Sequence, residues 1–484
     1  MIRLLGVVLW VSLIVQHPLS SLRADERVEH FDRDPQWETN NSHSNAFGAR
    51  PVRQDFGFRN SAHAGGRPGE LGGFITPAAE PAYYAKKIPE ATFADPLMAS
   101  GTFAGTDRSF HILLTFFNSK TLNEWRTPNT IAIRLSGRGD VCYAWLEYTT
   151  QKWRAGGDSP LGFATPIPNS RRTKPKEFRL KGQPHRWSLR YDPAANGGTG
   201  SITATIDSET AICHLTPGHK ADGAKFDRFG LLNVMKSVAA GGEVWLDDLE
   251  INGVREDFAR DPHWDALNNH KAYQSTNVRP RFDFGYSATQ FCGGKTPGEL
   301  GGLVFRGDCR YPERMGSYAD KLETLTLAKP ILASGQISLR RGVTDSSALL
   351  GFFDSKQSLR SNPSQSAGLP VNFLGIQIDG PSREGFLVAP AFRAGAADSG
   401  KSGPGADHIY PDGKVHDWKL RYQPGTGGKR PNLEVSLGQK TSRLELEASL
   451  NGVSFDRFGI ITTWIDGNGQ TIYFDDLTYT WKQP

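Results

Sequence analysis

The sequence GELGG occupies residues 69–73 and recurs without change at residues 298–302. Its two glutamates, Glu70 and Glu299, are 229 residues apart (299 − 70). Five identical residues at one distance can arise by chance, so the neighbouring motifs decide whether a whole unit is repeated. Seven further motif pairs recur in the same order and at nearly the same distance: FDRDPQW and FARDPHW (31–37, 258–264), DFGF and DFGY (55–58, 283–286), YAKK and YADK (84–87, 318–321), FFNSK and FFDSK (116–120, 352–356), HRWSLRY and HDWKLRY (185–191, 416–422), FDRFG (226–230, 455–459) and DDL (247–249, 475–477).

These eight ordered pairs indicate an internal duplication of a whole domain. The chain has 484 residues, which is enough for two domains that each bury a core. The first DDL motif ends the first unit and the second FxRDPxW motif begins the next. We therefore place the boundary near Gly253 and predict domains at residues 25–253 and 254–484.

The local pattern within each repeat is that of β-strands. In residues 185–191, His, Trp, Leu and Tyr alternate with Arg, Ser and Arg, and residues 416–422 repeat this alternation. A period of two gives one buried face and one exposed face. Short strands of this kind, separated by glycine-rich turns, predict an all-β fold of two tandem antiparallel β-sandwiches.

The order of these strands resembles a known family. A strand with the pattern His-x-Trp-x-Leu-x-Tyr, then Phe-Asp-x-Phe-Gly, then a closing Asp-Asp-Leu strand is similar to the concanavalin A-like lectin/glucanase jelly roll. The resemblance implies two curved sheets, a concave face that binds a glycan, and a structural calcium. The Glu-x-Asp-x-x-Glu strand of the retaining glucanases is absent, because the nearest candidate, Glu445-Leu446-Glu447, lacks the other carboxylates. This absence argues against carrying the glucanase activity over with the fold.

The N-terminus indicates an exported protein. Arg3 precedes an apolar run from Leu4 to Val15, which is too short to span a bilayer and has the form of a signal peptide. We predict a signal peptide at residues 1–24, a secreted or periplasmic location, and no membrane span after cleavage. An uncleaved anchor is the alternative. The net charge is +5, from 56 basic and 51 acidic residues without blocks of like charge, so we expect no nucleic-acid partner.

Four cysteines divide evenly between the halves: Cys142 and Cys213 in the first, Cys292 and Cys309 in the second. An even number in an exported chain favours disulfides, and pairing within each domain is the simplest arrangement. None of the four lies in a CxxC motif, which argues against a zinc site.

Three residues are candidate acids or bases. Glu70 and Glu299 lie between glycines that permit close approach of a ligand, and His63 shortly precedes the first glycine motif. The structural alternative is that each glutamate binds backbone amides and fixes an irregular loop. Because a residue that holds the fold is needed twice, its presence in both repeats fits this alternative.

Aromatic and arginine side chains are candidate ligand-binding residues, since aromatic rings stack on sugars and a guanidinium fork suits carboxylate or sulfate. Trp125 and Trp153 lie in polar segments and have no counterpart in the second repeat, so they are where function is expected to diverge. The alternatives are core packing for the aromatic rings and internal Asp–Arg contacts for the arginines. The complete set of ligand-binding candidates is Tyr84, Tyr318, Trp125, Trp153, Arg228 and Arg457.

Adjacent aspartates close each repeat. Neighbouring side chains on a strand point to opposite faces, so the two carboxylates cannot form one acid–base pair. One aspartate in each pair, Asp248 or Asp476, is a candidate ligand of the structural calcium, and solvation at a sheet edge is the alternative.

The sequence therefore predicts a secreted tandem β-sandwich that binds extracellular polysaccharide and requires no cofactor. The first alternative is a polysaccharide-degrading enzyme, either a hydrolase using Glu70 or Glu299 or a lyase using Tyr84 or Tyr318. The second alternative is a structural cell-surface protein. The oligomeric state is left open.

Overall fold

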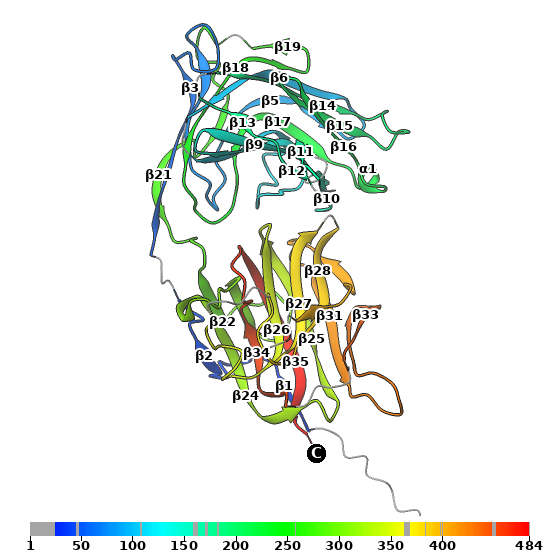
Figure 1. The fold of residues 1–484 in the computed structure, drawn as a ribbon. Helices are drawn as coiled ribbons and strands as arrows, with labels where there is room; N and C mark the ends of the chain where they lie inside the picture. The colour runs from blue at the N-terminus through cyan, green and yellow to red at the C-terminus, as the bar shows by residue number, and fades with distance from the viewer. Residues whose placement is uncertain are drawn as a thin grey trace, which may run out of the picture.

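The computed structural model describes residues 25–44, 48–106, 109–157, 163–169, 173–181, 183–256, 258–362, 368–382, 384–396, 398, 400–447 and 452–483. Two β-sandwiches lie one above the other (Figure 1). Within these residues, helix is confined to α1 (His219–Asp222) and the 3-10 turn η1 (Pro312–Arg314). The prediction of an all-β fold with two antiparallel sandwiches is confirmed. The predicted signal peptide, residues 1–24, lies outside the described residues.

The first sandwich consists of two antiparallel sheets, which we name after their central strands β8 and β6. The β8 sheet has the order β10-β9-β8-β7-β17-β5-β20, and the β6 sheet has the order β16-β15-β14-β6-β18-β4-β3-β21. The strands of the β8 sheet are β5 (Tyr83–Thr92), β7 (Phe110–Phe117), β8 (Thr130–Arg138), β9 (Val141–Thr149), β10 (Ala155–Gly157), β13 (Phe178–Arg179), β17 (Lys225–Asn233) and β20 (Asp265–Leu267). The strands of the β6 sheet are β3 (Arg50–Arg59), β4 (Glu70–Ile75), β6 (Leu97–Gly105), β14 (His185–Asp192), β15 (Ser201–Ile206), β16 (Glu209–His214), β18 (Gly242–Ile251), β19 (Val254–Arg255) and β21 (His270–Ser275). A separate hairpin is formed by β11 (Ala164–Pro166) and β12 (Thr173–Pro175).

The second sandwich repeats this topology with a β25 sheet and a β27 sheet. Their orders are β22-β23-β35-β25-β31-β32-β33 and β2-β24-β34-β26-β27-β28-β29. The strands of the β25 sheet are β1 (Asp25–Glu29), β22 (Phe282–Ser287), β23 (Glu299–Phe305), β25 (Ile331–Gly342), β31 (Val415–Gln423), β32 (Asn432–Leu437), β33 (Lys440–Glu445) and β35 (Gly469–Lys482). The strands of the β27 sheet are β2 (Glu38–Asn40), β24 (Ser317–Thr326), β26 (Ser346–Phe353), β27 (Phe373–Ser382), β28 (Gly385–Arg393), β29 (Lys401–Ser402), β30 (Asp407–Ile409) and β34 (Ser454–Ile461).

The core follows the predicted alternation. In β14, Trp187, Leu189 and Tyr191 are buried between the sheets, while Arg186 and Arg190 are exposed. The β8 sheet differs, because every residue of β7 is buried. A second, smaller cluster, which includes Leu113, Phe117 and Ala132 in the sheet, covers its other face. We call this other face, turned away from the main core, the outer face of the β8 sheet.

The opening segments of the two repeats are exchanged between the sandwiches. Strand β1 pairs with β35 and strand β2 with β24, so residues 25–44 complete the second sandwich. In the same way β19 pairs with β18 and β20 with β5, so residues 254–275 complete the first. The aromatic residues of these segments are buried accordingly. Phe31 and Trp37 belong to the core of the second sandwich, and Phe258 belongs to the core of the first.

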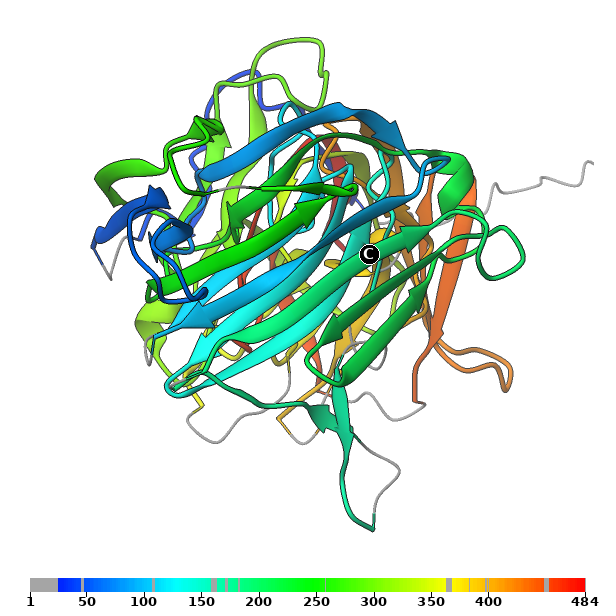
Figure 2. The ribbon, with the colours of Figure 1, turned by 90° about the horizontal axis from the view of Figure 1, so that it is seen from above.

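The chain therefore starts in the second sandwich, builds the whole first sandwich, and returns after Ser275. The sandwiches therefore differ from the predicted domains, 25–253 and 254–484, in one respect: the opening segment of each predicted domain belongs to the other sandwich. The physical reason is that each FxRDPxW segment buries its aromatic residues against strands of the other repeat. Viewed from above, the first sandwich lies over the second (Figure 2).

The prediction of disulfides is wrong for this structure. Cys142, Cys213, Cys292 and Cys309 are all buried, and no disulfide joins these four described residues. Cys142 and Cys213 pack as small apolar side chains in the main core of the first sandwich, and Cys309 packs in a separate small cluster with Trp464. Burial raises the pKa of all three thiols for which a shift is resolved: Cys142, Cys292 and Cys309.

The described part of the chain contains no helix with the length and apolar character that a membrane crossing requires.

The exchange makes a prediction about where stability is lost. Replacing fully buried Phe31 by Ala should destabilise the second sandwich by about 3–5 kcal/mol, because the lost ring leaves a cavity. Hydrogen–deuterium exchange should then speed up in β24 and β35, with β5 and β17 unchanged. The matched variant Phe258→Ala should show the reverse pattern, with faster exchange in β5 and β17. Faster hydrogen exchange in the first sandwich for Phe31→Ala, or in the second for Phe258→Ala, would contradict the swap of the opening segments between the sandwiches.

Candidate functional site

Glu70 fixes the loop that precedes its own strand. It is fully buried, and its carboxylate accepts hydrogen bonds from the Ser61 hydroxyl (2.7 Å) and from the backbone amides of His63 (2.8 Å) and Ala64 (2.8 Å). These donors all belong to the segment just before β4, so the carboxylate closes a short irregular loop onto the strand.

Glu299 has the same arrangement in the second sandwich. It accepts hydrogen bonds from the Thr289 hydroxyl and from the amides of Phe291 (2.9 Å) and Cys292 (2.8 Å). The two glutamates thus serve separate loops in separate sandwiches, which favours the structural alternative. A catalytic role for Glu70 or Glu299 stays a prediction.

His63 is exposed and stacks on Trp245, with ring centroids 4.4 Å apart. Phe291 and Tyr473 occupy the equivalent positions of the second sandwich, with centroids 4.8 Å apart. The position therefore holds one ring against another in both halves. An acid–base role for His63 stays a prediction.

The two tyrosines hold the exchanged segments. Tyr84 donates a hydrogen bond to Asp261 (2.9 Å), and Tyr318 donates one to Asp34 (3.1 Å), so each binds the aspartate of an FxRDPxW motif. Burial, assisted by the Asp261 carboxylate, raises the pKa of Tyr84 to about 12. The phenol is therefore protonated at neutral pH.

Arg228 and Arg457 bind the strands that belong to these exchanged segments. The Nε atom of Arg228 lies 2.9 Å from the Asp265 carboxylate in β20, and that of Arg457 lies 2.8 Å from the Glu38 carboxylate in β2. Both guanidinium groups are mostly buried. Their contacts account for their presence in both repeats, and a direct role in ligand binding stays a prediction.

The closing aspartates occupy a bulge. Asp248 and Asp476 have left-handed backbone conformations, with φ of 53° and 49°, at a shift in strand register. Their carboxylates contact Arg255 (3.4 Å) and His30 (2.7 Å). Among the described residues, no group of three or more His, Cys, Asp or Glu side chains is placed to hold a metal. A calcium at Asp248 or Asp476 stays a prediction.

Asp475, the neighbour of Asp476, is buried beside Glu299. Its Oδ1 atom accepts a hydrogen bond from the Asp476 amide (2.7 Å), and its Oδ2 atom has no hydrogen-bond partner in the described part of the chain. A Cβ at Gly294 would lie only 2.0 Å from this Oδ2, so only a glycine lets the backbone at residue 294 come this close to the carboxyl. Burial, with the charges of Asp476 and Glu299, raises the pKa of Asp475 to about 7.

The outer face of the β8 sheet carries a different kind of site. The neighbours of His111, Arg134 and Glu147 along their strands all point into the main core. These three side chains therefore point to the outer face from the adjacent strands β7, β8 and β9. The loop of residues 121–127 crosses over them and brings Trp125.

Arg134 lies at the centre of this group. Its guanidinium carbon is 4.6 Å from the centroid of the Trp125 ring and 4.0 Å from that of Trp145. Its Nε atom donates to Glu147 (2.5 Å), which also accepts a hydrogen bond from the Trp125 indole (3.0 Å). Its Nη1 atom is 3.2 Å from Nε2 of His111. We call His111, Trp125, Arg134, Trp145 and Glu147 the Arg134 cluster.

The cluster has a defined protonation pattern. Arginine only donates, so Nε2 of His111 accepts and the ring proton lies on Nδ1. Burial and the charges of Arg134, Lys236 and Arg138 hold the pKa of His111 well below its ordinary value, so the imidazole is neutral. Glu124, in the covering loop, is also buried, and burial raises its pKa to about 7.

The Arg134 cluster is specific to the first sandwich. Strand register places Ser347 at the position of His111, Gln377 at that of Arg134, and Ala391 at that of Glu147. Ala389 likewise replaces Trp145. The contacts that hold the loops and the exchanged segments are duplicated, whereas this network is not.

The second sandwich approaches the outer face with its end loops. Arg341, at the end of β25, donates a hydrogen bond to the Ala79 carbonyl (3.1 Å) and attracts the Glu124 carboxylate. Ser237 donates to Asn468 (3.1 Å). The Arg134 cluster therefore lies on the side of the first sandwich that faces the second.

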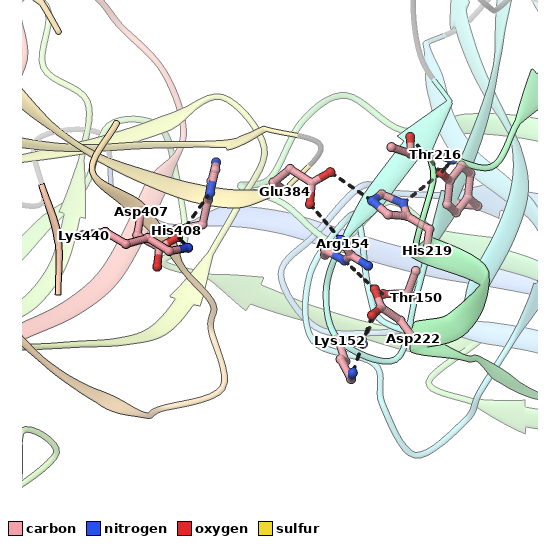
Figure 3. Close-up of polar contacts among 11 residues, drawn as sticks. Thr150, Lys152, Arg154, Thr216, His219, Asp222, Glu384, Asp407, His408 and Lys440 are labelled. Atoms are coloured by element: carbon pink, nitrogen blue, oxygen red, sulfur yellow. Dashed lines mark hydrogen bonds and ion pairs between the residues drawn. The ribbon is translucent and has the colours of Figure 1, made fainter. Parts of the chain in front are cut away.

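A second polar group joins the sandwiches directly (Figure 3). Glu384, at the turn between β27 and β28, lies between His219 (3.1 Å) and Arg154 (3.2 Å) of the first sandwich. His219 also contacts the Tyr148 hydroxyl (2.9 Å), and Arg154 donates to Asp222 (2.5 Å). We call Arg154, His219 and Glu384 the latch.

Both acid–base members of the latch have shifted pKa values. Burial lowers the pKa of His219, against the opposing pull of Glu384. Burial pushes the pKa of Glu384 upward, but its contacts with His219 and Arg154 outweigh this, so its pKa lies below the ordinary value. Trp153, the remaining ligand-binding candidate, is half-buried in the turn next to Arg154, and a role in binding stays a prediction.

Of the predicted ligand-binding residues, only Trp125 belongs to the Arg134 cluster. His111, Arg134 and Glu147 were missed, although a signal was present. In residues 131–135 an arginine interrupts an apolar strand pattern, and the next strand carries Trp145 and Glu147 at alternate positions. The second repeat has no charged residue at the matching positions of Arg134 and Glu147.

No protein-family model matches the chain, and a search of curated proteins found no match. Solved structures that the comparison finds similar to this chain include domains LG4-5 of the mouse laminin alpha1 chain, with 11% identity and a TM-score of 0.24 over 97% of this chain and 99% of that one. The carbohydrate recognition domain of Emp47p has 11% identity and a TM-score of 0.26 over 41% and 88% of the two chains. The binding domain of botulinum neurotoxin serotype G has 10% identity and a TM-score of 0.23 over 89% and 94%.

The pKa of Asp475 predicts a pH-dependent stability. The folded protein keeps the Asp475 carboxyl protonated up to about pH 7, whereas in the unfolded chain it ionises near pH 3.8. The stability that this proton contributes to the folded state is therefore present at low pH and is lost as the pH rises through 7. Asp475→Asn should therefore raise the Tm more at pH 8 than at pH 5. The exposed variant Asp140→Asn serves as the control. An equal change in Tm at both pH values would contradict the assignment.

The latch predicts the opposite dependence. The lowered pKa values of His219 and Glu384 mean that its stability is present above the ordinary pKa values and is lost as the pH falls. Hydrogen exchange in α1 and in the β27–β28 turn should rise between pH 7.5 and 4.5, after correction for intrinsic rates. Glu384→Gln should show the faster exchange already at pH 7.5, and the exposed-pair variant Glu434→Gln should not. Wild-type-like exchange in Glu384→Gln would rule out the latch as a joint between the sandwiches.

Proposed function

We propose that the chain is a secreted carbohydrate-binding protein that engages extracellular polysaccharide through the outer face of its first sandwich. The Arg134 cluster carries this proposal, because it is a built network of polar and aromatic side chains that the second sandwich lacks. Binding sites typically combine aromatic surface with a few well-placed polar groups. Trp125 and Trp145 are half-buried and supply rings, and Tyr143 lies 6.1 Å from Trp145 between centroids.

The polar members of the cluster are buried and hold its rings in place. Glu147 accepts hydrogen bonds from Arg134 and from the Trp125 indole, and Arg134 also donates to His111, so the rings are the surface offered to a sugar. The network also fixes the side chains before a ligand arrives, since Arg134 is held by two rings and a carboxylate. A rigid site loses less conformational entropy on binding.

A polysaccharide-degrading enzyme is the second candidate, and one observation favours it. Glu124, with a pKa of about 7, and neutral His111 lie on the same face, and general acids and bases work best with pKa values near the working pH. Glu70 and Glu299 stay candidate acids or bases for this activity, and Glu124 is the additional carboxyl to test first.

A polysaccharide array tests binding. The wild type should bind at least one polysaccharide class, and Trp145→Ala should weaken that binding about tenfold or more, equivalent to about 1.4 kcal/mol. The control is Trp481→Ala, a partly buried tryptophan of the second sandwich that stacks with Arg27 at 4.8 Å. Absence of any binding, with the protein folded, would overturn the proposal and favour a structural cell-surface role.

The same samples separate binding from turnover. An enzyme should release reducing ends or unsaturated products from the bound polymer, and Glu124→Gln should reduce that release while leaving binding intact. Binding without release would leave a lectin-like protein.

A further inference from the structure

The outer face of the β8 sheet has more positive charge than its own carboxylates balance. Lys236, which follows β17, lies with its ammonium nitrogen 5.9 Å from the centroid of Trp125. Arg138, at the end of β8, lies with its guanidinium carbon 5.9 Å from the centroid of Tyr143. Neither cation has a carboxylate partner within 4 Å among the described residues.

The nearby acids are already engaged or neutralised. Glu147 is bound by Arg134 and by the Trp125 indole. Glu124 is buried, with a pKa of about 7, and its carboxylate is attracted by Arg126 and by Arg341. Arg279, in the connection between the sandwiches, adds a further positive charge near Lys236, although Asp466 pairs with it at 2.9 Å.

This arrangement carries a free-energy cost in the unliganded protein. Burial, together with the charges of Arg279, Arg134 and Arg138, lowers the pKa of Lys236 to about 8. A cation that is removed from water without a counterion is unfavourable. An anion bound beside it would remove that cost and would contribute charge-assisted hydrogen bonds.

We propose that the polysaccharide bound by the first sandwich is anionic, and that Lys236 and Arg138 bind its carboxylate or sulfate groups while the rings of Trp125 and Trp145 contact the sugar. This inference rests on the proposed function, because it names the class of glycan for the same face. It assigns the two unpaired cations as specificity-determining residues outside the Arg134 cluster.

The second repeat provides an internal comparison. The FDRFG motifs are 229 residues apart and the following DDL motifs 228, so the residue that corresponds to Lys236 is Ile465 or Trp464, neither of which is a cation. Ile465 is exposed. The second sandwich therefore keeps the strand that leads to this position and lacks the cation, so anion binding is assigned to the first sandwich alone.

The test compares three polymers with matched variants of the full chain. Calorimetry or affinity electrophoresis would use a polyuronate, a sulfated galactan, and the carboxyl-reduced form of the same polyuronate. The wild type should bind the polyuronate or the sulfated polymer, with an affinity that falls as salt rises, and should bind the reduced polymer at least tenfold more weakly. Binding of the polyuronate would identify the carboxylate as the recognised group, and binding of the sulfated galactan would identify the sulfate.

Lys236→Ile copies Ile465 of the second repeat and should lose at least tenfold in affinity for the anionic polymer. Lys236→Arg should retain most of it, and Arg138→Ala should weaken it in the same direction. The control is Lys419→Ile, which removes an exposed lysine from β31 of the second sandwich and should change nothing. Unchanged melting temperatures would show that the variants fold.

Each outcome bears on one proposal. Equal binding of the polyuronate and its reduced form, or full affinity in Lys236→Ile, would overturn the anionic assignment while carbohydrate binding stands. Binding of no polymer by the folded wild type would overturn both. Loss of affinity confined to the anionic polymers and to the Lys236 and Arg138 variants would establish the assignment.

Discussion

Burial of the aromatic residues of each FxRDPxW segment against the other repeat is the constraint on which the structure depends. Gly298 has a φ of 138°, and a Cβ there would lie 1.8 Å from the Phe31 carbonyl oxygen; Gly69 meets Phe258 in the same way at 1.9 Å. The glycine motif is therefore the surface on which the exchanged segment docks, and the glutamate that follows fixes the adjoining loop. Neither sandwich is complete without residues from the other half of the chain.

This exchange also decides where a site can form. The chain crosses between the sandwiches twice, and side-chain contacts, among them those of Glu384 in the latch, join the sandwiches further. The end loops of the second sandwich are thereby held near the outer face of the β8 sheet, where Arg341 reaches the loop carrying Glu124. The buried faces of each sandwich provide stability, whereas the outer face is positioned by contacts between the sandwiches.

The repeat, the fold class and the strand pattern were predictable because they depend on local periodicity and on identity between two parts of one chain. The exchange was not predictable, since two nearly identical segments such as residues 31–37 and 258–264 satisfy either sandwich equally well in sequence. The Arg134 cluster needed the strand register, which pairs Arg134 with Trp145 and places His111 and Glu147 two residues from the positions opposite Arg134. The disulfides were predicted from the even cysteine count and the expected compartment, neither of which says how far apart the cysteines lie in the fold, and the structure buries all four without a disulfide.

The duplication supplies its own control for function. A buried ion pair such as Arg134–Glu147 is a weak source of stability, because removing both charges from water offsets much of their attraction. The second sandwich has the same fold with Gln377 and Ala391 at these positions, so the fold does not require the pair. Tyr84, Arg228 and Glu70, by contrast, recur with their partners in both halves. The Arg134–Glu147 pair is present in one sandwich and absent from the equivalent positions of the other, so the fold itself does not explain it, and this is why the proposed site is placed on the outer face of the β8 sheet.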